Sequence, residues 1–221
     1  VAVARLEQRD APAQLVLAAA QAELRWGVAL FKSRYRDFIV SNIDVTDTTT
    51  VPLDPGMAAN TRTFQSINAA RAEISGYELM AEYGFAPEWS AEARYAHAKG
   101  DQWAADGTKS ALPTIEPDKA TFALRYERKG AFGGELLFTA QKSQRRPYAA
   151  NLYIPKGYIT ADLSGWWDIT KQWQLNLAIG NIGDVKYVNW ADIRGAASTT
   201  TLADAYTQPG RNASISARYQ F

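Results

Sequence analysis

Cysteine is absent from this chain of 221 residues, and histidine occurs only once. The lack of cysteine excludes disulfide frameworks and thiolate metal sites. Neither charge predominates, because 24 Lys and Arg stand against 23 Asp and Glu, so the composition indicates no attraction to nucleic acid. The longest apolar runs, such as residues 15–20 and 26–31, have six residues, whereas a membrane helix needs about 18–20. If the chain crosses a membrane, it must do so as strands.

Aromatic residues are frequent, at 12% of the chain, and they help to mark its last ten residues as a strand. In residues 212–221 apolar and polar side chains alternate without a break, and one face consists of Ala213, Ile215, Ala217, Tyr219 and Phe221. Successive side chains of a strand point to opposite faces, so one face must meet an apolar phase and the other water or polar groups. A strand of about 9–11 residues that ends in aromatics is typical of a transmembrane β-barrel.

The same alternation recurs in earlier segments, and the sequence predicts eight strands in all. The earlier seven comprise residues 23–35, 64–85, 91–96, 121–127, 135–141, 159–167 and 173–179. Long connections (36–63, 100–118, 143–156, 183–211) alternate with short turns near 86–89, 130–133 and 170–172. Short turns on one side and long loops on the other are the topology of an outer-membrane barrel. Each short turn carries an aromatic residue suited to a membrane interface, namely Trp89, Phe132 or Trp173.

We therefore predict an all-β fold, an antiparallel transmembrane β-barrel whose apolar face meets lipid and whose polar face lines the lumen. Arg94, Arg125, Glu135 and Arg218 belong to the polar face. In a soluble β-barrel the same residues would form the solvent-exposed outer surface, and this alternative stays open. Alternation also does not distinguish a closed barrel of about eight strands, filled by side chains, from part of a barrel of about 22 strands.

Several segments resemble TonB-dependent outer-membrane receptors. Residues 64–79 (FQSINAARAEISGYEL) are similar to one strand of that family, and residues 115–126 are similar to a Pro-led strand downstream. More specific are GYITADL at 157–163, NIGDVKY at 181–187, WADIRG at 190–195 and YTQPGRN at 206–212. Together these resemble the C-terminal third of a haem or haemoglobin receptor, and the resemblance covers residues 23–221.

The resemblance implies that residues 23–221 are about eight C-terminal strands of a larger barrel of about 22 strands around an N-terminal plug. It implies a location in the Gram-negative outer membrane, a ligand bound at the outer face, and uptake driven by the TonB complex through the plug and its TonB box. Outer-membrane lipid and the barrel-assembly machinery are implied as partners, with Tyr219 and Phe221 as the insertion signal. Haem is expected as a transported ligand, not as a covalently bound cofactor.

Residues 1–22 lie outside this assignment. They are rich in Ala and interrupted by Pro12, and a short helix, a frayed strand and sequence foreign to the barrel all stay open. They also lack the basic start and the apolar stretch of about 7–15 residues that form a secretory signal. Because an outer-membrane protein needs such a signal, we expect the natural sequence to begin further upstream.

Candidate ligand-binding residues lie in the long loops and are Arg145, Arg146, Tyr148, Tyr187, Trp190 and Arg194. Arginine pairs with carboxylates such as haem propionates, and aromatic side chains stack on flat rings. The loops of any barrel contain such residues, so a general surface role is the alternative.

His97 is a conceivable haem ligand, because neutral imidazole binds iron. Strand parity instead places it on the lipid-facing side with Tyr95, near the outer rim, and we expect an interfacial residue. No metal site and no catalytic site are predicted, because lumenal carboxylates such as Glu92 and Glu135 are expected to pair with arginine.

The sequence therefore predicts that this chain is part of an outer-membrane receptor for TonB-dependent uptake of haem or haemoglobin-derived iron. Within transport, the alternative is a siderophore receptor, which shares the barrel and differs in its loops and plug. Outside transport, the alternatives are a self-contained eight-stranded outer-membrane barrel with a structural or adhesive role, and a soluble β-barrel that carries a small hydrophobic ligand.

Overall fold

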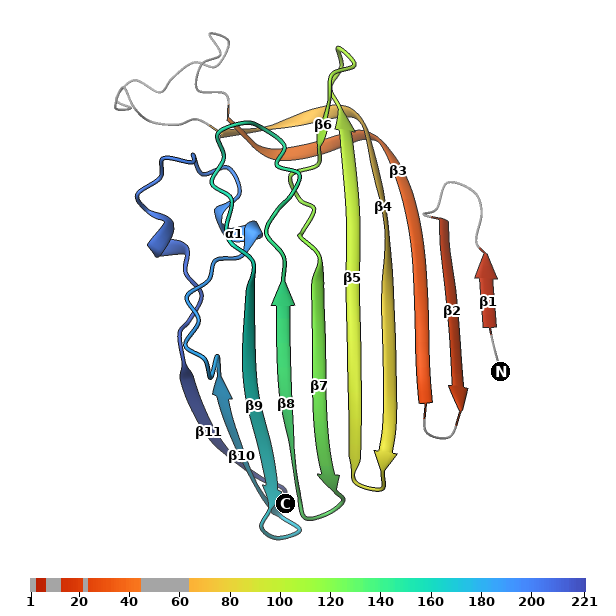
Figure 1. The fold of residues 1–221 in the computed structure, drawn as a ribbon, viewed down its shortest axis with the longest axis vertical. Coiled ribbons are helices and arrows are strands. Elements are labelled where there is room, and N and C mark those ends of the chain that lie inside the picture. The colour runs from red at the N-terminus through yellow and green to blue at the C-terminus, as the bar shows by residue number, and fades with distance from the viewer. Residues whose placement is uncertain (1–2, 7–12, 22–23, 45–63) are drawn as a thin grey trace.

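The computed structural model describes residues 3–6, 13–21, 24–44 and 64–221, which form one tall, curved antiparallel sheet (Figure 1). The sheet order is β1-β2-β3-β4-β5-β7-β8-β9-β10-β11, with the short β6 paired to β5. The strands are β1 (Val3–Leu6), β2 (Ala13–Gln21), β3 (Leu24–Asp44), β4 (Phe64–Ala86), β5 (Trp89–Trp103), β6 (Lys109–Ala111), β7 (Lys119–Arg128), β8 (Phe132–Gln141), β9 (Tyr158–Asp168), β10 (Trp173–Gly180) and β11 (Asn212–Tyr219). Two short helices, α1 (Trp190–Ile193) and the 3₁₀ helix η1 (Ala203–Tyr206), lie in the loop before β11.

The eight predicted strands are all present, and the sheet extends beyond them. Residues 1–22, to which no role was assigned, contribute β1 and β2, and β2 pairs with β3 from Ala13↔Lys32 to Gln21↔Leu24. The first predicted loop begins too early, because β3 continues to Asp44 past a positive φ of 52° at Asp37 and an irregular register between Val40 and Ile43. The remainder of that loop, residues 45–63, lies outside the described residues.

The register separates an apolar face from a polar face, as the alternation predicted. Phe122 pairs with Phe138 on one face, and Arg125 pairs with Glu135 on the other, where Arg125 Nη2 lies 2.6 Å from Glu135 Oε2. Along β10 and β11 the apolar face stays open to its surroundings, because Leu177 is 52% exposed and Ile215 is 70% exposed. A single-layered sheet with an uncovered apolar face and an ion-paired polar face is the wall of a transmembrane barrel.

Aromatic rings pack against one another along the edge of the sheet that carries the short turns, and this edge is at the bottom of Figure 1. Trp89 lies 6.3 Å from Phe85 and 5.0 Å from Tyr126, measured between ring centroids. Further along the same edge, Trp173 packs 4.9 Å from Tyr219. This row is the interfacial girdle that the aromatic residues of the turns predicted.

The described sheet is open, with β1 and β11 as its two outer strands. Both outer strands present unpaired backbone groups, and such groups are costly in hydrocarbon unless another strand pairs with them. Among the described residues, no helix has the length and apolar character to span a membrane.

Candidate functional site

The most deeply buried side chains lie at the end of the sheet that carries the long loops. Trp190 and Ile193 of α1 are each 1% exposed, and Leu112 of the loop before β7 is 2% exposed. The indole Nε1 of Trp190 donates a 2.8 Å hydrogen bond to the carbonyl oxygen of Pro113, 77 residues earlier. Two loops that are distant in sequence are therefore packed into one small core, and Figure 1 shows α1 at about the level of the upper ends of β8 and β9.

Two glycines allow this packing. A Cβ atom on Gly100 would lie 2.6 Å from the side chain of Ile115, so only glycine lets the loop before β7 approach β5. Gly195 has a φ of +93°, which favours glycine and turns the chain away from the end of α1. The WADIRG segment is thus explained by packing, since it supplies two buried side chains and the turn that follows them.

The loop between β10 and β11 is closed at its base by two further segments of the resemblance, residues 181–187 and 206–212. Asn181 is 4% exposed, and its Nδ2 donates to the carbonyl oxygens of Val185 and Pro209 at 2.9 and 3.2 Å. The backbone N–H of Arg211 donates to Asp184 Oδ1 at 2.8 Å. Because these bonds join the first and last residues of the loop, they close its base and hold its two ends together.

Polar side chains on the lumenal face connect the loops to the strand ends. The Tyr158 hydroxyl lies 2.6 Å from Gln141 Oε1 and 2.9 Å from Asn189 Oδ1. Gln141 Nε2 donates to Glu116 Oε2 at 3.3 Å, and Asp192 Oδ2 accepts hydrogen bonds from both Asn189 and Gln208. We call this set the lumenal network, comprising Glu116, Gln141, Tyr158, Asn189, Asp192 and Gln208.

Tyr187 and Arg194 border the lumenal network. The Tyr187 ring packs on the Tyr158 ring at a centroid distance of 4.1 Å, and burial raises the pKa of Tyr187. Burial also raises the pKa of Glu116, against a hydrogen bond from Gln141 and the nearby positive charge of Arg194, which lower it. Two packed tyrosine rings, a carboxyl group and a nearby cation thus lie together at the lumenal network.

The six candidate ligand-binding residues do not form one site. Tyr187 and Arg194 lie at the lumenal network, whereas Trp190 is buried and holds two loops together. Arg146 belongs to a second region, where its Nη2 lies 2.5 Å from Asp101 Oδ1. Arg145 is exposed there, beside a pocket of about 140 Å³, and Tyr148 is half-buried.

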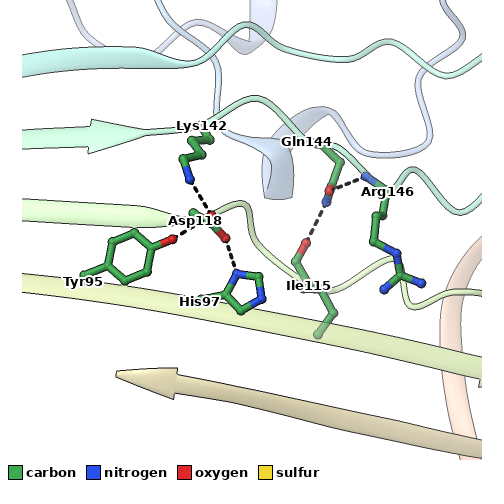
Figure 2. Close-up of polar contacts among 7 residues, drawn as sticks. All are labelled: Tyr95, His97, Ile115, Asp118, Lys142, Gln144 and Arg146. Atoms are coloured by element: carbon green, nitrogen blue, oxygen red, sulfur yellow. Dashed lines mark hydrogen bonds and ion pairs between the residues drawn. The ribbon is translucent and has the colours of Figure 1, made fainter. Parts of the chain in front are cut away.

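His97 lies on the outward face, as its parity predicted. Its ring is 5.2 Å from that of Tyr77, its cross-strand neighbour. Figure 2 shows that His97 and Lys142 converge on Asp118, with His97 Nδ1 2.6 Å from Oδ1 and Lys142 Nζ 2.8 Å from Oδ2. Tyr95 completes the group, which we call the Asp118 cluster, by donating its hydroxyl to Oδ2 at 2.8 Å.

Electrostatics keep the carboxyl of Asp118 ionised. Burial alone would raise its pKa, but the hydrogen bonds from Lys142, His97 and Tyr95 outweigh burial and hold the pKa of Asp118 well below its usual range. His97 therefore has a structural partner in a rim cluster. Among the described residues, no group of three or more His, Cys, Asp and Glu side chains is placed to hold a metal ion.

The long strands, the uncovered apolar face, the aromatic girdle and the one-sided loops define a transmembrane β-barrel protein. The family model described as TonB dependent receptor-like, beta-barrel matches residues 19–182. The chain belongs to this family of outer-membrane receptors, as its sequence motifs predicted.

Two relatives from Neisseria meningitidis are similar to this chain. Lactoferrin-binding protein A of serogroup B (strain ATCC BAA-335 / MC58) is 28% identical in an alignment 129 residues long, which covers 50% of this chain and 14% of the relative. Hemoglobin-haptoglobin utilization protein B of serogroup C is 24% identical in an alignment 225 residues long, which covers 86% of this chain and 28% of the relative. The first name describes binding of lactoferrin, and the second describes utilization of hemoglobin-haptoglobin.

Among solved structures, the copper transporter OprC superimposes with a TM-score of 0.74 at 21% identity, over 95% of this chain and 31% of that one. The FrpB iron transporter from Neisseria meningitidis (F3-3 variant) gives a TM-score of 0.67 at 15% identity, over 95% of this chain and 31% of that one. At these identities the similarity establishes the fold alone. The chain spans less than a third of the length of each of these four proteins.

Proposed function

We propose that this chain is the C-terminal part of the barrel of a Gram-negative outer-membrane receptor that takes up haem or haemoglobin-derived iron with energy from the TonB complex. The observation that carries the proposal is the similarity to hemoglobin-haptoglobin utilization protein B, which extends over 86% of the chain and thus includes the loops as well as the strands. The second relative is named as a lactoferrin-binding protein.

The loop architecture supports a protein ligand. A receptor that grips a folded protein needs loops held in a fixed shape, because ordering loose loops on binding costs free energy. Here the hydrogen bond from Trp190 to Pro113 joins two long loops, and the hydrogen bonds of Asn181 close the base of the second loop. Within the second of these loops, Tyr187 and Arg194 are the residues assigned to contact haem, through ring stacking and a propionate ion pair.

The remaining parts of the proposal follow from membership of the family. A plug domain and its TonB box, outside this chain, would couple the barrel to the TonB complex. The barrel-assembly machinery would recognise Tyr219 and Phe221 as the insertion signal. Outer-membrane lipid would cover the apolar face. Haem is the cargo in this proposal, no residue is assigned a catalytic role, and no nucleic acid is expected as a partner.

A ferric siderophore is the second candidate cargo. Solved receptors for ferric yersiniabactin and ferripyoverdine share this fold over 95% of the chain, with TM-scores of 0.62 and 0.58. At 18% identity each, these similarities support the fold and do not indicate which ligand is bound.

The test uses the full-length receptor in an iron-starved strain that lacks other iron receptors. Growth on haemoglobin and on haem, but not on a ferric siderophore, is the expected result. The variant Y187A/R194Q should bind haem at least about tenfold more weakly, because it loses a stacking partner and an ion pair. The matched control K171Q changes an exposed cation in the short turn before β10 and should bind haem normally. Growth on the siderophore alone would overturn the proposal.

A further inference from the structure

A lysine lies in the same cross-strand row as two residues of the lumenal network. Lys119, the first residue of β7, pairs with Gln141 of β8, and Gln141 pairs with Tyr158 of β9. Residues directly opposite in antiparallel strands share one face, so Lys119 lies on the lumenal side with Gln141 and Tyr158. Lys119 and Tyr158 are two strands apart, or about 10 Å at about 4.8 Å per strand. One planar ring system can bridge this gap.

Lys119 has no carboxylate opposite it, unlike three arginines that lie nearer the short turns on the same face. Each of those arginines forms an ion pair with a glutamate: Arg25 with Glu82, Arg94 with Glu92, and Arg125 with Glu135. Lys119 instead lies between Ala96 and Gln141 in its row and is exposed. It forms no ion pair with any residue that the structure describes, so its positive charge is available to a ligand.

Lys119 and Arg194 both lie close to the carboxyl group of Glu116. Burial raises the pKa of Glu116, and the positive charges of Arg194 and Lys119 both act to lower it. Within the described part of the chain neither cation forms an ion pair with this carboxyl, which accepts its hydrogen bond from Gln141 at 3.3 Å. Two cations from different elements are thus placed beside one carboxyl group at the border of the lumenal network.

The lumen is open beside Lys119. Gly27, Ala29 and Ala96 have small side chains or none, and with Lys119 they line a hollow of about 470 Å³. Small-molecule sites have volumes of about 300–1,000 Å³ and are mostly apolar, with a few polar groups that fix the orientation of the ligand. The hollow has the size and character of such a site, and a ligand in the lumen can reach Lys119.

We propose that Lys119 and Arg194 together bind the two carboxylates of a planar, dianionic ligand, so that this site selects a porphyrin dicarboxylate. Lysine binds a carboxylate as a point charge, and arginine binds one through paired hydrogen bonds. Haem carries its two propionates on one edge of the ring, which matches two cations beside one carboxyl group. The packed rings of Tyr158 and Tyr187 offer a surface on which the porphyrin stacks. The inference rests on the proposed function, because it adds a second anchor to the same haem site.

The test titrates the full-length receptor, purified in detergent, with haem and follows the Soret absorbance. K119Q removes the charge of Lys119 and keeps a polar side chain. K129Q is the matched control, because it removes an exposed lysine from the short turn at the other end of the same strand. We expect the apparent affinity for haem to fall at least about fivefold in K119Q and to stay within about twofold of the native value in K129Q. The conservative variant K119R should also stay within about twofold, because it keeps the charge.

Haem dimethyl ester separates a charge contact from a structural role, because both of its propionates are neutral. The native receptor should bind the ester more weakly than haem, and K119Q should bind the ester as well as the native receptor does. Equal losses of haem and ester binding in K119Q would overturn the proposal. Unchanged haem binding in K119Q, with weaker binding in R194Q, would overturn the role of Lys119 and leave the proposed function intact. If the native receptor bound neither haem nor its ester, the proposed function would fail, and this inference with it.

Discussion

Trp190 and Pro113, 77 residues apart in the chain, are joined by a 2.8 Å hydrogen bond from the indole Nε1 to the carbonyl oxygen. Because Trp190 is only 1% exposed, both polar atoms would be deprived of water if the bond were lost. A single buried side chain thus fixes the loop before β11 against the loop before β7. The rigidity proposed for ligand capture depends on this contact.

The variant Trp190→Phe tests the contact while keeping an aromatic ring in the core. It should lower the free energy of unfolding by about 1–3 kcal/mol, because the carbonyl of Pro113 is left buried without its donor. Limited proteolysis of the full-length receptor should show faster cleavage between β10 and β11. Trp173→Phe, in the exposed girdle, is the matched control. Equal cleavage rates in the native protein and Trp190→Phe would contradict the assignment of Trp190 as an anchor.

Glu116 should make the stability of the loops depend on pH. Burial raises its pKa from the usual 4.5, so the folded protein holds the proton more tightly than the unfolded chain. The resulting stabilisation is complete below pH 4.5 and is lost as the pH rises through the folded pKa.

The variant Glu116→Gln removes this titration and keeps an oxygen that accepts from Gln141. Its melting temperature should exceed that of the native receptor by about 1–3 °C at pH 8, and the difference should shrink toward pH 4. Melting curves at pH 4, 6 and 8 measure it, with the exposed Glu127→Gln as control. If the difference in melting temperature between Glu116→Gln and the native receptor were the same at every pH, the raised pKa of Glu116 could not be its cause.

Asp118 should show the opposite dependence on pH. Its pKa is held below the usual 3.8 by Lys142, His97 and Tyr95, despite the effect of burial. The stabilisation is therefore present at neutral pH and is lost as the pH falls below 3.8 toward the folded pKa.

Asp118→Asn should destabilise the receptor by about 1–3 kcal/mol at pH 7, because charge-assisted hydrogen bonds are replaced by weaker ones. Denaturant unfolding at pH 7 measures the loss, and Asp204→Asn, in the exposed pair with Lys186, serves as the control. If both variants lowered the free energy of unfolding by the same small amount, the Asp118 cluster would stabilise the protein no more than a surface ion pair does.

The strands within the membrane were predictable because lipid enforces alternation there. Leu163, Trp167 and Leu177 must face outward whatever the loops do. β2 was missed because its run of alanines gives little contrast between the two faces. The upper part of β3, residues 36–44, was missed because its alternation is interrupted: Asp37 has a positive φ, residues 38–40 are consecutively apolar, and the register is irregular between Val40 and Ile43.

The site was less predictable than the fold. Trp190 and Tyr187 look alike in the sequence, as aromatic residues in a long loop, yet Trp190 is buried and Tyr187 borders the lumenal network. What separates them is a contact with Pro113, across 77 residues, which no local pattern encodes. Gln141 and Tyr158 were not singled out, although their positions at strand ends beside long loops offered a signal.

Ile215 and Ser216 are adjacent in β11, face opposite sides of the sheet, and together test whether lipid covers the apolar face. Ile215 is 70% exposed and pairs with Leu177 near the middle of the strand. Lysine there would place a charge in hydrocarbon, so Ile215→Lys should destabilise the folded barrel by about 2–4 kcal/mol, whereas Ser216→Lys, toward the lumen, should cost less than about 1 kcal/mol. Urea unfolding of the full-length receptor in lipid vesicles measures both. A larger loss for Ser216→Lys would mean that the faces are reversed and that the polar side is the one turned away from water.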